Sequence, residues 1–159
     1  MICAEECRQG ASWIEQDLAY VLVSLTDLSI PSMPYAAICR SMFDTDPRTL
    51  FMALYRCIEA TYAFESSRKV VDRLGPAIPW QELAAALEEE VGWHPQEASS
   101  LQVVLRHAME KDLEELCACL GAEAGKDVQI SAGRSLYALR NQVVHYRPGV
   151  RSIAIESMD

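Results

Sequence analysis

Three side chains with complementary chemistry stand close together near the C-terminal end of the chain: Arg140, Asn141 and His145. A guanidinium is a planar fork of donors that matches the oxygens of a phosphate and the charge that builds up in its transition state. An imidazole exchanges protons near neutral pH and can act as an acid or a base. This pair suits cleavage of an RNA phosphodiester by the ribose 2′-hydroxyl, which needs no metal ion or other cofactor and leaves a 2′,3′-cyclic phosphate.

A helix must position these groups, and the pattern predicts one over residues 128–147 with Asp127 as its cap. Each residue of a helix turns by about 100°, so Asn141 and His145 share one face. Arg140 lies on the flank of that face, within reach of the same space. We expect Asn141 to orient His145 or to hold the phosphate. The apolar side of this helix consists of Leu136, Leu139 and Val143.

Charge is distributed unevenly along the chain. The net charge is −9, yet residues 128–152 contain four arginines and no acid, so the other residues carry ten basic and 23 acidic side chains. A basic segment of this kind favours contact with the RNA backbone. Arg134 and Arg147 are the expected phosphate contacts, and Tyr146 is expected to stack on a base or to pack at a dimer seam.

Apolar residues recur with a helical period along the chain, and no alternating run indicates a strand. Asp46 is the expected cap of the longest helix, and Pro47 lies in its first turn. Helices are predicted over residues 11–28, 34–43, 47–74, 80–91, from 95 to 120 with a possible break near Lys111, and 128–147.

These elements predict an all-α fold. We expect an antiparallel helical bundle over residues 46–150, an N-terminal helical extension over 1–45 and a tail over 151–159. No secretory signal and no apolar run of about 18 residues is present, so we expect a cytoplasmic protein without a membrane segment. The six cysteines form no CxxC pair, and we interpret them as reduced thiols, mostly buried, rather than as a metal site.

The string from Arg140 through Asn141 to His145, late in a helical chain, resembles the signature of the HEPN superfamily. There an arginine and a histidine are separated by about four to six residues, with a polar residue favoured directly after the arginine. Tyr146 also resembles aromatic residues that follow the motif in some variants. The resemblance covers roughly residues 46–148.

Membership of that superfamily would imply a metal-independent endoribonuclease. HEPN domains pair about a two-fold axis, so that two motifs face each other across a cleft, and the resemblance therefore implies a homodimer with a composite site. Such domains serve as toxins, antiviral effectors or RNA processors, which makes an antitoxin or another partner protein possible in addition to RNA.

Two other interpretations stay open. The first is a HEPN module that binds nucleotide, RNA or a partner protein without cutting, which the charge of −9 favours. The second is a helical adaptor in which Arg140 pairs with an acid on a neighbouring helix while His145 caps its own helix. Glu59 lies one residue off the apolar stripe of the longest helix, and we interpret it as a supporting residue that holds Arg140 or pairs with Arg56.

Overall fold

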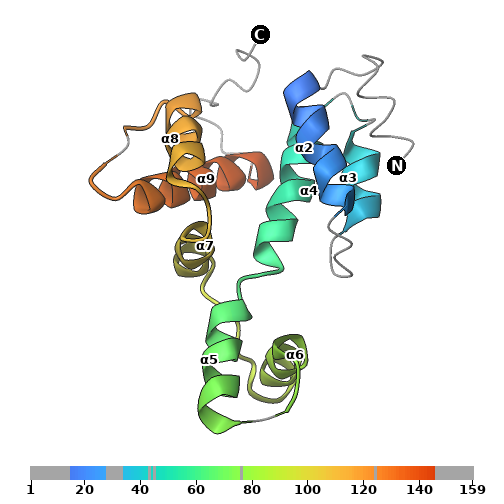
Figure 1. Ribbon diagram of the computed structural model, residues 1–159, viewed down its shortest axis with the longest axis vertical. Helices are drawn as coiled ribbons and strands as arrows, with labels where there is room; N and C mark the ends of the chain where they lie inside the picture. The colour runs from blue at the N-terminus through green and yellow to red at the C-terminus, as the bar shows by residue number, and fades with distance from the viewer. Residues whose placement is uncertain are drawn as a thin grey trace. The chain divides into compact units, whose positions relative to one another are not determined.

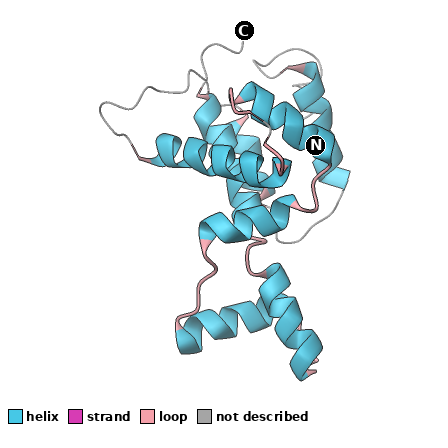
Figure 2. Ribbon diagram, turned by 90° about the vertical axis from the view of Figure 1, so that its left-hand side faces the viewer, coloured by secondary structure: helices cyan, strands magenta, loops and turns pink. Residues whose placement is uncertain are grey.

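The computed structural model of the chain describes residues 15–27, 34–42, 44, 46–75, 77–123 and 125–145, and these residues form an all-α fold without a strand (Figures 1 and 2). The predicted fold class is confirmed. None of the helices in these ranges has the length and apolarity that crossing a membrane requires. The helices are α2 (Gln16–Asp27), α3 (Tyr35–Ser41), α4 (Pro47–Glu59), α5 (Phe64–Leu74), α6 (Trp80–Val91), α7 (Glu97–Leu105), α8 (Glu110–Cys119) and α9 (Val128–Val144).

The chain divides into two units, Met1–Cys57 and Ile58–Asp159. The boundary predicted after residue 45 precedes α4, whereas this division falls near the C-terminal end of α4. Ile58 and Glu59, the last two residues of α4, thus belong to the second unit. The predicted tail, residues 151–159, lies outside the described residues.

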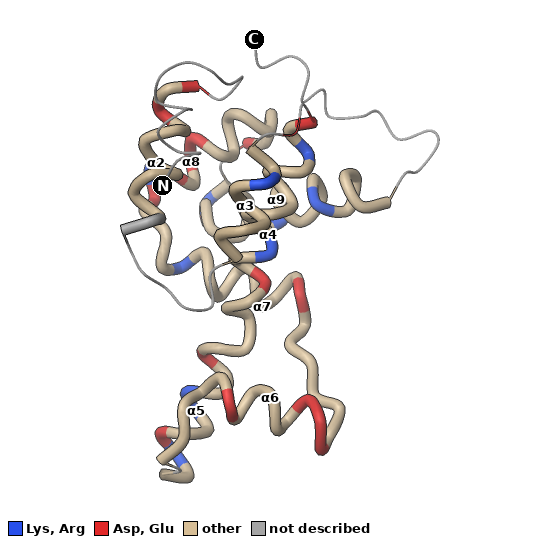
Figure 3. Tube along the Cα trace, turned by 90° about the vertical axis from the view of Figure 1, so that its right-hand side faces the viewer, with Lys and Arg blue, Asp and Glu red and all other residues tan. Residues whose placement is uncertain are grey.

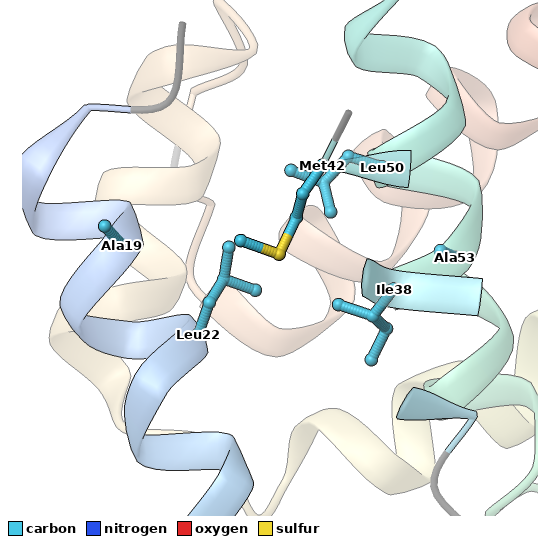
Figure 4. Close-up of a cluster of buried hydrophobic side chains, with 6 residues drawn as sticks. All are labelled: Ala19, Leu22, Ile38, Met42, Leu50 and Ala53. Atoms are coloured by element: carbon cyan, nitrogen blue, oxygen red, sulfur yellow. The ribbon is translucent and has the colours of Figure 1, made fainter. Parts of the chain in front are cut away.

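The first unit has a small core of its own, which Figure 4 shows between α2, the end of α3 and α4. Helix α3 is held to α2 by the Tyr35 hydroxyl, which donates to the Leu25 carbonyl at 3.0 Å. At the start of α4 the Asp46 carboxylate accepts the backbone N–H of Arg48 at 3.0 Å, so the predicted cap is confirmed. The core side chains are Ala19, Leu22, Ile38, Met42, Leu50 and Ala53.

The single long helix predicted from Pro47 to Leu74 is wrong. Between α4 and α5 the backbone forms a turn whose N–H groups donate to the carbonyl three residues earlier. The N–H of Thr61 donates to the Ile58 carbonyl, and that of Tyr62 donates to the Glu59 carbonyl. The Thr61 hydroxyl also donates to the Ile58 carbonyl at 2.7 Å, which favours the turn over continuation of the helix. As a result Glu59 stands at the C-terminal end of a helix instead of in its middle.

In the second unit α5 and α6 form one packed pair, joined by an edge-to-face contact between the rings of Phe64 and Trp80 at 5.3 Å. Gly75 and Gly92 end these helices in the left-handed conformation, with φ of 68° and 64°, as the sequence indicates. The helix predicted from Pro95 to residue 120 is divided after Leu105, earlier than the expected break near Lys111.

Helix α9 packs against both α7 and α8 (Figure 1). Its first turn is capped as predicted, because the Asp127 carboxylate accepts the N–H of Ile130 at 3.0 Å. This arrangement buries the side of α9 that was predicted to be apolar, including Leu136 and Leu139. The buried hydrophobic residues of the three helices are Leu101, Leu105, Leu113, Cys117, Val128, Ala132, Leu136 and Leu139.

Candidate functional site

Arg140 of α9 is the centre of an ion-pair network that includes two glutamates from other helices. Its Nη2 nitrogen lies 3.5 Å from Oε1 of Glu59 and 3.6 Å from Oε1 of Glu97. Glu59 is the last residue of α4, and Glu97 is the first residue of α7. One guanidinium therefore contacts two carboxylates that are distant in sequence, and all three residues belong to the second unit.

The remaining donors of Arg140 differ in their hydrogen-bond partners. Nη1 donates to Oδ1 of Asn141 at 3.1 Å, so the guanidinium is turned toward the next residue of the motif. Nε is buried and has no hydrogen-bond partner in the described part of the chain. The Arg140 side chain as a whole is 17% exposed.

Close packing of α7 against α9 places Glu97 beside Arg140. A Cβ atom on Gly133 would lie 3.2 Å from Cγ of Gln102, so the two helices approach closely at this point. Arg140 lies seven residues after Gly133 in α9, a rise of about 10 Å. Its partner Glu97 lies five residues before Gln102 in α7. The two helices are therefore antiparallel, and the missing side chain at Gly133 permits the approach.

His145 follows the last residue of α9 as its C-terminal cap. Its backbone N–H donates to the Asn141 carbonyl at 2.9 Å. The imidazole is exposed and makes no hydrogen bond or ion pair within the described ranges. Val144 beside it is 44% exposed.

The structure brings some of the predicted site residues together and leaves others apart. Arg140, Asn141 and Glu59 are joined by direct contacts, and the suggested contact of Glu59 with Arg140 is present. Arg134 is exposed and is turned about 120° around α9 from Arg140, so it does not join this network. Arg147 and Tyr146 lie outside the described residues.

Glu97 was missed by the sequence analysis. It lies 43 residues before Arg140, in a segment that reads as an ordinary helix start. The contact of Glu97 with Arg140 changes the local charge. The group of Arg140, Glu59 and Glu97 carries a formal charge of −1, although the segment around Arg140 contains no acid of its own. Figure 3 shows basic residues along α9 and the acidic run of α6 at the far end of the same unit.

Two further groups of reactive side chains lie apart from Arg140. Glu65 of α5 is paired with Lys69 at 3.2 Å and with His107 at 3.4 Å, and the hydrogen bond from Lys69 is the main reason why the pKa of Glu65 is lowered. Burial raises the pKa of the Cys57 thiol, which donates to the Ala53 carbonyl. Over the described ranges the cysteines are free thiols, of which Cys117 is buried and Cys119 exposed.

Neither a scan against protein-family models nor searches of curated proteins and solved structures finds a match to this chain. The arrangement around Arg140 therefore has to be interpreted from its own chemistry. It combines a cation suited to a phosphate, carboxylates that accept protons and an exposed imidazole at the end of the same helix.

Proposed function

We propose that the chain is a metal-independent endoribonuclease of the HEPN type, acting as a toxin, an antiviral effector or an RNA processor. The observation that carries this proposal is the bond from Arg140 to Asn141, which turns the guanidinium toward the helix face that ends in His145. A guanidinium that binds the phosphate and an imidazole that transfers a proton together suit in-line attack of a ribose 2′-hydroxyl on its neighbouring phosphate.

The two-fold pairing implied by the resemblance completes this proposal. The His145 imidazole makes no bond to the Arg140 network within the described residues of its chain, and Val144 beside it is exposed. Both features favour a homodimer in which His145 of each copy serves the Arg140 network of the other. A C₂ pair presents the same surface twice, which brings two such sites to one seam.

Cleavage of a mixed-sequence RNA oligonucleotide in the presence of a chelator tests the proposal. We expect His145→Ala to lower the cleavage rate by about 100-fold or more, because a positioned acid or base contributes roughly that much. His94→Ala is the matched control, since His94 is an exposed histidine of a loop and pairs only with Glu88 at 3.7 Å. It should leave cleavage unchanged.

The nature of the products provides the second measurement. Cleavage through the 2′-hydroxyl yields a 2′,3′-cyclic phosphate and leaves DNA of the same sequence intact. Binding of the RNA without any product between pH 5 and 9 would instead support a HEPN module that does not cut. Wild-type activity in both His145→Ala and Arg140→Ala would end the enzymatic proposal.

A second candidate, a helical adaptor, is favoured by the double ion pair of Arg140. A guanidinium held by Glu59 and Glu97 also serves to fix three helices together, without any substrate. In an adaptor, Arg140→Ala would lower the thermal stability of the chain and leave its affinity for RNA unchanged.

A further inference from the structure

We propose that Glu97 is the general base of the reaction, a role that rests on the endoribonuclease function proposed above. The Arg140–His145 pair offers a single side chain that exchanges protons near neutral pH, whereas cleavage of an RNA linkage needs two such groups. Oε1 of Glu97, in α7, lies 3.6 Å from Nη2 of Arg140. This guanidinium is the group that would hold the phosphate.

Exposure distinguishes Glu97 from the other carboxylate of the network. The Glu97 side chain is 45% exposed and that of Glu59 is 29% exposed. Glu97 makes no ion pair other than that with Arg140 within the described residues, and this ion pair uses its Oε1 oxygen. The more enclosed Glu59 is a positioning residue, which holds Nη2 while Nη1 is directed to Asn141.

The proton transfers balance with these groups. The Glu97 carboxylate takes the proton of the 2′-hydroxyl as the 2′ oxygen forms its bond to phosphorus. The bond from phosphorus to the 5′ oxygen breaks, and the His145 imidazolium gives its proton to that oxygen. The products are a 2′,3′-cyclic phosphate and a free 5′-hydroxyl, and Arg140 stabilises the negative charge on the phosphorane in between.

Position relative to the phosphate also supports this role. A phosphate bound by the Nη nitrogens of Arg140 would lie beside the carboxylates that contact Nη2. The attacking 2′-hydroxyl belongs to the ribose adjacent to that phosphate. A base must lie within hydrogen-bond reach of the proton that it removes. Glu97, the more exposed of the two carboxylates held on Nη2, meets that requirement.

The test compares Glu97→Gln with Glu89→Gln, which removes one negative charge from an exposed position of α6. We expect Glu97→Gln to lower kcat/KM for RNA cleavage by about 100-fold or more. Affinity for a 2′-O-methyl RNA of the same sequence, which cannot be cut, should be unchanged or higher because a negative charge has left the site. Glu89→Gln should cleave and bind as the wild type does.

Glu97→Asp keeps a carboxylate on a shorter stem and should retain part of the cleavage rate that Glu97→Gln loses. Wild-type cleavage by Glu97→Gln would overturn the proposal and leave Glu97 as a counter-ion of Arg140. It would also be overturned if Gln and Asp variants lost cleavage equally and both melted at a lower temperature, as a purely structural contact requires. Absence of cleavage by the wild-type chain contradicts the endoribonuclease function itself, which is a different result.

Discussion

Arg140 is a cationic side chain in surroundings that are largely closed to water, with 17% of the side chain exposed. Two carboxylates compensate the charge, but Nε remains buried without a hydrogen-bond partner in the described chain. Ion pairs with partly exposed partners contribute about 0–1 kcal/mol, since water screens them. An apolar residue at this position would avoid the cost of the unpaired donor. On these grounds the guanidinium of Arg140 adds little to the free energy of unfolding, which is consistent with the binding role proposed for it.

A double-mutant cycle between Arg140→Ala and Glu97→Gln measures the contact directly. We expect a coupling free energy of about 0.5–1 kcal/mol in urea unfolding, the range of half-exposed ion pairs. The control cycle pairs Arg134→Ala with Glu97→Gln and should show no coupling, because the exposed Arg134 makes no ion pair within the described residues. Equal coupling free energies in both cycles would mean that the coupling arises from the overall charge and not from the contact between Arg140 and Glu97.

At the scale of the helices, local signals predicted most boundaries. Asp46 and Asp127 cap the helices that were expected after them, and Gly75 and Gly92 end α5 and α6. Caps and terminal glycines are predictable because each acts within one turn of its own helix. The break at Thr61 was missed although the apolar stripe is interrupted just beyond it, between Tyr62 and Val70. An apolar stripe with a gap is compatible with one helix in which a single turn lacks an apolar residue, and equally with two separate helices.

The contacts between helices were not predictable in the same way. Arg140 and Asn141 are adjacent in sequence and could be proposed as a site, whereas Glu97 reaches them only because α7 crosses α9 at Gly133. A glycine within a helical pattern does not say which helix will approach it. Glu59 was identified because it lies one residue off an apolar stripe, whereas Glu97 lies at an ordinary helix start.

The crossing of α7 and α9 gives a prediction about Gly133. A valine there would bring its side chain against Gln102 and Leu105, where a Cβ atom alone lies at 3.2 and 3.5 Å. Overpacking of this kind costs about 1–3 kcal/mol, so we expect Gly133→Val to lower Tm by about 2–12 °C. Ala138→Val, at an exposed position of the same helix, should change Tm far less. An unchanged Tm for Gly133→Val would contradict the close crossing.

For the whole molecule, the charge distribution limits how RNA can approach. The net charge of −9 repels a polyanion in general, and the trio of Arg140, Glu59 and Glu97 is itself negative. Binding then depends on local groups of basic residues, and in sequence the acid-free segment 128–152 with its four arginines is the strongest such group.

Mixing inactive variants tests whether the site is shared between two copies. If Arg140 and Glu97 act from one chain and His145 from the other, a dimer of Arg140→Ala with His145→Ala retains one intact site. Random exchange places about half of the chains in such dimers, so about a quarter of the wild-type rate should return. Arg140→Ala mixed with Glu97→Gln should recover nothing, since both changes fall in the half of the site that one chain supplies. Recovery of activity in neither mixture would mean that each chain works alone. Recovery in both mixtures would mean that Glu97 and Arg140 of one chain act in different active sites, which contradicts the role proposed for Glu97.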